Sequence, residues 1–261
     1  MYSVNDFNNA NTIEISDNII ETFNKLNRSF TKKNIQKHKY LKKTTIATDC
    51  HSTIKTLINK ITLETYSENS VELIEEFDKF TDKQGCSSKI FDILSKNNFY
   101  SSLYASLYSK LIEHDEIFLQ TLNNNIENIN SLYDEIKCHD ANENYDLFCK
   151  SNENNGNIKS LTTFYSYLLL NDNVTCDFII NNINYLIEKI KVVKDNLVIF
   201  ELLENINIYI TITHNIICKH EKWGSIIQNI EDMKGKRREF SDLKNKCVFK
   251  CMDILDFVNK I

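Results

Sequence analysis

The chain contains no proline and only four glycines among its 261 residues. Sandwiches and hairpins built from β-strands need both residue types at their turns, and loops that cradle phosphate need glycine. This scarcity argues against those classes of fold and favours helices joined by short polar turns. With 42% hydrophobic residues, the chain can bury one sizeable core without help from disulfides or metals.

Targeting and membrane-spanning signals are also missing. No uncharged apolar run is long enough to cross a bilayer, and the N-terminal residues carry acids in place of a basic start and an apolar core. The eight cysteines are scattered and form no regular framework of a small secreted module. These absences predict a soluble, cytoplasmic protein with reduced thiols.

Signatures of catalysis and of metal binding are likewise absent. The sequence lacks GxSxG, HExxH, GxGxxG and P-loop motifs. Cysteine and histidine gather near Cys50, Cys138 and His214, but without CxxC pairs or fixed zinc spacing. We therefore expect a protein that is not an enzyme and has no catalytic residue, no metal site and no cofactor.

A basic stretch interrupts this acidic chain, whose formal net charge is −5. Residues 25–43 hold eight cations and no acid, and Phe30 and Tyr40 lie among them, which suits phosphate contacts and base stacking. The eight cations are Lys25, Arg28, Lys32, Lys33, Lys37, Lys39, Lys42 and Lys43. We predict that residues 1–48 form a partly ordered arm that contacts mRNA, with a merely solvated lysine-rich tail as the alternative.

Residues 49–261 show apolar spacings of three and four, separated by polar clusters, which predicts ten helices. Pairs recur about every 40 residues, so we expect an all-α fold, an α-solenoid of about five antiparallel HEAT-like hairpins. Residues 138–156 are expected to form a mobile polar loop. The predicted helices are Ser52–Glu64, Asn69–Thr81, Ser87–Lys96, Tyr100–Glu113, Glu116–Lys137, Ile158–Leu170, Cys176–Lys191, Asp195–His214, Lys222–Met233 and Ser241–Ile261.

Four segments, in this order, carry a family resemblance. They are LINKIT (Leu57–Thr62), IFDILSKNNFYSSLYASLYSKL (Ile90–Leu111), GNIKSLTTFYSYLLL (Gly156–Leu170) and KCVFKCMDILDFV (Lys246–Val258). Together they span roughly residues 52–260 and resemble the middle domain of eukaryotic translation initiation factor 4 gamma. Two positions depart from the family pattern, since Leu63 stands where proline is usual and Val248 where arginine is usual.

The resemblance implies a translation initiation scaffold that grips a DEAD-box RNA helicase of the initiation factor 4A type and stimulates it. The helicase would supply all the ATP chemistry. Three alternatives stay open: a related helicase-binding scaffold in mRNA splicing or decay, a decoy that inhibits the helicase, and a purely RNA-binding helical module. Because fold analogy alone does not prove function, the partner has to be tested.

The same resemblance places helicase contacts at Ile58, Ile61 and Phe249, and at the acid pair Asp253 and Asp256. Periodicity supports these positions unequally. The two isoleucines share an apolar helical stripe with their neighbours, which also fits a buried core. On a helical wheel Phe249 points away from the apolar face of the last helix, as a binding anchor would. The two aspartates also fit an ordinary solvated face.

An amphipathic segment, residues 17–30, overlaps the basic stretch. Ile19, Ile20, Phe23 and Leu26 fall on one helical face of this segment. The strict tyrosine and leucine motif by which factor 4 gamma recruits a cap-binding protein is absent. The segment is therefore our candidate for contact with a cap-binding protein.

Overall fold

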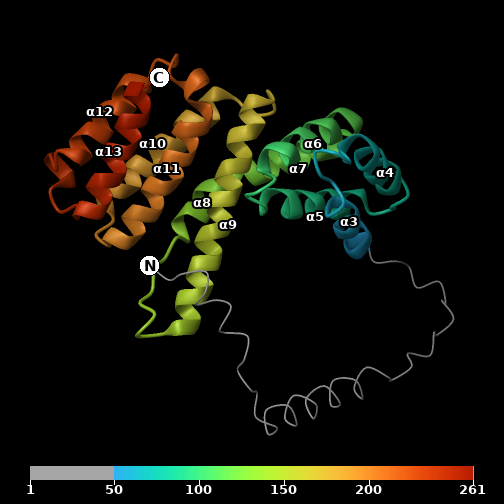
Figure 1. The fold of residues 1–261 in the computed structure, drawn as a ribbon, viewed down its shortest axis with the longest axis horizontal. Helices are drawn as coiled ribbons and strands as arrows, with labels where there is room; N and C mark the ends of the chain where they lie inside the picture. Colours follow the sequence, from blue (N-terminus) through green and yellow to red (C-terminus); the bar gives the residue numbers. More distant parts are fainter. Residues whose placement is uncertain (1–49, 261) are drawn as a thin grey trace, which may run out of the picture. The chain divides into compact units, whose positions relative to one another are not determined.

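Eleven α-helices and no β-strand make up residues 50–260, the part of the chain that the computed structural model describes (Figure 1). The all-α prediction is confirmed. The arm predicted for residues 1–48 lies outside the described residues. The helices are α3 (Cys50–Ile58), α4 (Tyr66–Asp78), α5 (Lys83–Ser95), α6 (Ser101–His114), α7 (Glu116–Glu127), α8 (Ile129–Asp134), α9 (Tyr145–Leu170), α10 (Cys176–Val192), α11 (Asn196–Ile217), α12 (Trp223–Lys234) and α13 (Asn245–Lys260), with a short 3-10 helix, η2 (Arg238–Phe240), before the last.

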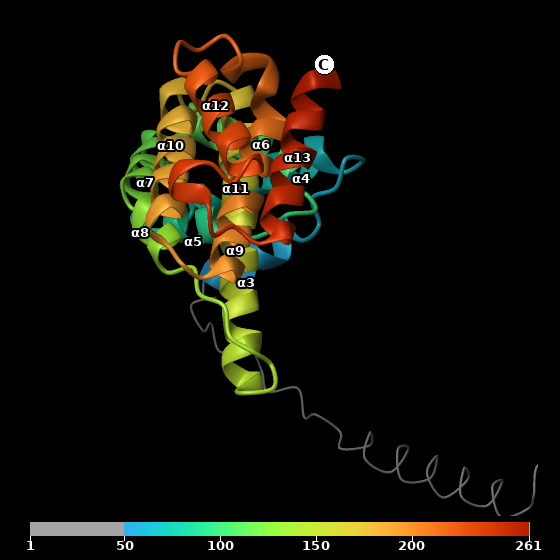
Figure 2. The same ribbon diagram turned by 90° about the vertical axis from the view of Figure 1, so that its left-hand side faces the viewer.

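The helices stack in two layers. One layer consists of α3, α5, α7, α8, α10 and α12, and the other, which we call the second layer, consists of α4, α6, α9, α11 and α13; each helix packs on the next one in its layer. Figure 2 places α7, α8 and α10 on one side of α9 and α11, and α4 and α13 on the other. Each helix thus buries its apolar face mainly against its neighbours in the stack, as in a solenoid.

The helices of the second layer run parallel to one another from α9 to α13. Lys159 of α9 pairs with Glu201 of α11 at 3.0 Å, and Lys250 of α13 pairs with Glu204 of α11 at 2.6 Å. Lys246 lies over the Phe200 ring, 3.7 Å from its centroid. Residue numbers rise in the same direction across the contacts between α9 and α11 and between α11 and α13. The three helices are therefore parallel, and the paired side chains lie on the same side of the layer.

A chain of buried hydrogen bonds crosses the centre of the stack. The Tyr133 hydroxyl of α8 lies 3.2 Å from that of Thr162 in α9 and 2.7 Å from that of Tyr209 in α11. Thr162 donates to the Asn205 side chain at 2.7 Å, and Asn182 of α10 donates to Tyr209 at 3.4 Å. All five side chains are buried, so the chain fixes the register of four helices.

The donors in this chain can be assigned in one direction. The single hydroxyl proton of Thr162 goes to Asn205, so Tyr133 must donate to Thr162 and Tyr209 must donate to Tyr133. Burial raises the pKa of Tyr133 to about 12, and raises the pKa of Tyr209 further above its ordinary value. Both phenols therefore stay protonated at neutral pH and can act as donors.

The loop predicted for residues 138–156 is wrong over most of its length, because α9 already begins at Tyr145. Asn144 caps the helix by accepting a hydrogen bond from the backbone N–H of Leu147 at 2.9 Å. Asn155, which is buried, donates to the backbone carbonyl of Lys137 at 2.9 Å. Capping and this tertiary contact offset the poor helix propensity of an asparagine-rich stretch.

The helix predicted for Glu116–Lys137 is broken at Asn128 into α7 and α8. Asn125 and Asn128 donate to the backbone carbonyls of Thr121 and Asn124, four residues earlier, and such side-chain bonds compete with the helical ladder. The predicted pairing of this region with α9 also differs, since α7 packs on α5 and α6 whereas α9 packs chiefly on α6 and α11. The other four predicted helix pairs do pack on each other.

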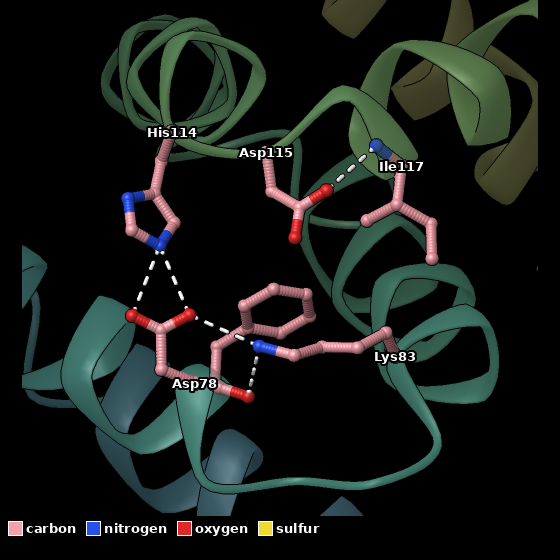
Figure 3. Close-up of polar contacts among 6 residues, drawn as sticks. Asp78, Lys83, His114, Asp115 and Ile117 are labelled. Atoms are coloured by element: carbon pink, nitrogen blue, oxygen red, sulfur yellow. Dashed lines mark hydrogen bonds and ion pairs between the residues drawn. The ribbon is translucent and has the colours of Figure 1, made fainter.

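A polar clasp joins α4, α5 and α6 (Figure 3). The His114 imidazole Nε2 lies 3.0 and 3.1 Å from the two carboxylate oxygens of Asp78, and the Lys83 amine lies 3.0 Å from one of them. The Lys83 amine also donates to the backbone carbonyl of Phe77 and lies 4.0 Å from the centroid of its ring. The hydrogen bonds from His114 and then from Lys83 lower the pKa of Asp78.

Tyr209→Phe should destabilise the fold by roughly 1–3 kcal/mol, because it removes a donor from Tyr133 and leaves Asn182 without an acceptor in a buried site. Urea unfolding measures the loss. Tyr100→Phe, which removes a hydroxyl outside the buried chain, should change stability by less than about 0.5 kcal/mol. Equal effects of the two variants would contradict the role given to the buried chain.

The Asp78 clasp should also make stability depend on pH. The pKa of Asp78 is lower in the folded protein than in the unfolded chain. As the pH falls, the unfolded chain therefore takes up the proton first, near the ordinary aspartate pKa of about 3.9. The stabilisation is therefore complete above that pH and is lost as the pH falls through the folded pKa. In chemical denaturation between about pH 4 and pH 2, wild type should lose more unfolding free energy than Asp78→Asn, while Asp256→Asn should behave like wild type.

Candidate protein-binding surface on the last helix

The last helix, α13, has a buried face and an exposed face that differ sharply in character. Cys247, Cys251, Ile254 and Leu255 are buried against α11 and α12, as the wheel predicted. Phe249 projects from the opposite face and is 61% exposed. The position predicted to stand away from the core therefore does so.

Three further exposed side chains share this outer face. Met252 is 42% exposed, and Asp253 and Asp256 are also exposed. At 100° per residue these positions fall within about 60° of Phe249, so the four side chains occupy one stripe. We call this stripe, Phe249, Met252, Asp253 and Asp256, the α13 face.

The charges of the α13 face are uncompensated. Neither Asp253 nor Asp256 forms an ion pair or a hydrogen bond with another described residue. Two nearby cations are engaged elsewhere, Lys250 by Glu204 and Lys246 by the Phe200 ring. The face thus offers one aromatic anchor and a flexible thioether beside two free carboxylates.

This arrangement fits a partner with an apolar pocket bordered by lysine or arginine. Exposed aromatic side chains that enter a pocket supply much of the energy of many protein interfaces. Carboxylates at the edge of such an interface act mainly on the association rate and on specificity. The α13 face therefore has the composition of a surface that binds a protein.

Ile58 and Ile61 do not share this surface. Their side chains are 0% and 1% exposed and belong to the hydrophobic core. The structure therefore favours the core interpretation of these two residues, and contact with a partner through them would require the fold to open. Figure 1 places α3 and α13 at opposite ends of the stack, so the predicted positions are not brought together.

Other predicted positions lie elsewhere. The basic residues from Lys25 to Lys43 and segment 17–30 are outside the described residues. Met252 was missed by sequence reasoning, although the helical wheel already placed it near Phe249. Leu63, at the position where the family has proline, is 82% exposed between α3 and α4.

Two of the thiols and two of the histidines lie in structural surroundings. Burial raises the pKa of Cys251 to about 12 and that of Cys138 to about 11, so these thiols stay protonated and unreactive. His220 bonds to Asp177 at 2.9 Å, and His214 packs edge-on against Trp223. Within residues 50–260, no three histidine, cysteine or acidic side chains are grouped so that they could hold a metal ion.

Comparisons with known proteins leave the family open. Neither the models of protein families nor the curated proteins contain a match to this sequence. Among the helices between residues 50 and 260, none has both the length and the hydrophobicity needed to span a bilayer.

The α13 face should be dispensable for folding. Phe249→Ala is expected to change the unfolding free energy by less than about 0.5 kcal/mol, because the ring is largely in water. Ile254→Ala, on the buried face of the same helix, should cost roughly 2–5 kcal/mol. Denaturant unfolding of both variants tests this contrast, and a large loss with Phe249→Ala would show that the ring serves the fold.

Proposed function

We propose that this chain is a translation initiation scaffold that binds a DEAD-box RNA helicase of the initiation factor 4A type and stimulates it. The observation that carries the proposal is the α13 face. Its aromatic side chain is exposed at the position where the resemblance to the middle domain of factor 4 gamma places a helicase contact. The two free aspartates beside it match the acid pair of the same motif.

A scaffold of this kind needs no catalytic residue. A helicase with two lobes interconverts between open and closed arrangements, and a protein that binds the closed arrangement more tightly raises its population. The gain is limited to the difference between the two affinities, since a ligand with equal affinity for both states shifts nothing. The buried hydrogen bonds at the centre of the stack join four helices, which supports a scaffold that holds two lobes at a set distance.

Stimulation requires contact with both lobes of the helicase. Ile58 and Ile61 are buried, so they do not supply the second contact in this fold. The α13 face supplies one contact. The second contact has to come from exposed residues, so the decoy, which occupies one lobe without closing the helicase, is the main rival. The sign of the effect on ATP hydrolysis separates the two.

RNA and a cap-binding protein are proposed partners of the N-terminal region. The eight cations between Lys25 and Lys43 would contact phosphates, and segment 17–30 would contact the cap-binding protein. Binding through phosphate contacts predicts an RNA affinity that falls steeply with salt. The proposed site of action is the cytoplasm.

The deciding experiment is the RNA-dependent ATPase rate of purified initiation factor 4A, with and without the full chain. Wild type should raise the rate. Phe249→Ala should weaken helicase binding about tenfold or more, as loss of a central anchor does. Val71→Ala, an exposed apolar position on α4, serves as the matched control and should behave like wild type.

Other outcomes identify the rivals. Binding with a suppressed rate would replace the scaffold by a decoy. No binding and no change in rate would overturn the assignment to initiation, and recovery of a different DEAD-box protein in pull-downs would then point to splicing or decay.

A further inference from the structure

A groove lies on the second layer, and none of its described lining residues belongs to α13. It is formed by the turn between α5 and α6 and by the facing sides of α6, α9 and α11, and its volume is about 330 Å³. The large apolar and aromatic side chains that line it are Phe99, Tyr167, Ile208 and Ile212. Volumes of this size are in the range of ordinary binding pockets.

The groove has one unusual wall. Phe99 is 87% exposed. An exposed phenylalanine forgoes the favourable free energy that burial of its ring would contribute. Its ring is held by an edge contact with Tyr100, at 4.8 Å between centroids, and Tyr100 in turn packs on Tyr104. The side chain therefore lies beside the groove in contact with Tyr100 and is available as an anchor.

Among residues 50–260, no charged side chain lines the groove. Two cations of the second layer pair with acids on a neighbouring helix, Lys159 of α9 with Glu201 of α11 and Lys250 of α13 with Glu204 of α11. A nucleic acid strand needs cations along its phosphates, so it finds no support here. A charged peptide segment would lose its hydration in the groove without gaining an opposite charge. The complementary occupant is therefore an uncharged segment.

The polar side chains of the groove suit a peptide backbone. Asn98, Ser102, Asn207 and Thr211 carry amide and hydroxyl groups. The Thr211 hydroxyl donates to the Asn207 side-chain oxygen at 3.5 Å, so the Asn207 amide N–H and the Asn98 and Ser102 side chains are left to bond a ligand. An extended chain presents N–H and C=O groups that need such partners when they leave water. The apolar walls between them accept a side chain of the same segment.

We propose that this groove binds an extended, uncharged peptide segment of a partner protein, with one bulky apolar side chain of that segment inserted between Phe99 and Ile208. The inference stands apart from the helicase proposal, because it rests on the groove alone. It also assigns Phe99, which lies in the gap between two helices, a role that its exposure would otherwise leave unexplained.

A phage-displayed library of random peptides of about twelve residues, selected on the full chain, tests the inference. Selection should enrich peptides with a bulky apolar residue among uncharged neighbours. Fluorescence polarisation of the enriched peptides should show binding about tenfold or more weaker to Phe99→Ser and to Ile208→Lys. Val71→Ser is the matched control, and an unchanged thermal transition in all three variants shows that they fold.

Three outcomes would overturn the inference. They are the absence of any enriched sequence, enriched peptides that bind Phe99→Ser as well as wild type, and a single-stranded oligouridine that binds at this groove and is released by the same substitution. Loss of peptide binding with helicase stimulation intact would separate this groove from the α13 face.

Discussion

The hydrogen-bonded chain from Asn182 through Tyr209, Tyr133 and Thr162 to Asn205 is the constraint on which the rest of the structure depends. Apolar contacts along a helix tolerate small sliding movements, whereas buried polar groups must meet their partners or lose about 1–3 kcal/mol each. Since these five side chains come from α8, α9, α10 and α11, their bonds set the relative height of the central helices. These bonds therefore also set the relative positions of the side chains that α9 and α11 expose on the outer surface of the second layer.

The middle of the second layer and its exposed surface consequently have different roles. Helices α9 and α11 lie in the middle of the second layer and pack on the helices to either side of them, while exposed side chains on α13 and the groove between α6, α9 and α11 face outward. The α13 face combines Phe249 with two uncompensated carboxylates, and the groove beside Phe99 has no charge at all. The two surfaces therefore favour partners of different chemistry.

Much of the fold could be predicted from the sequence because apolar periodicity reports which side of a helix is buried. This holds for α13, where the wheel separated Cys251 and Ile254 from Phe249. It fails for α9, whose first ten residues are mostly polar and become helical through the cap at Asn144 and the tertiary bond from Asn155. Periodicity does not report such bonds.

The site was less predictable than the fold. Ile58 and Ile61 satisfy a family motif, but their apolar stripe already favoured a place in the core, and the packed structure shows both side chains buried there. Phe99 lies between helices, where no periodicity applies, so its exposure could not be foreseen. Resemblance locates candidate contacts along the chain, but burial decides which of them can reach a partner.

Photo-crosslinking tests the central claim most directly, namely that the α13 face is the surface that meets the helicase. A photo-reactive amino acid would replace Phe249 and, separately, Leu119, which is exposed on α7 in the other layer. The account predicts that purified initiation factor 4A is crosslinked from position 249 and not from position 119. Crosslinks from position 119 alone, or from neither position while the two proteins bind, would contradict it.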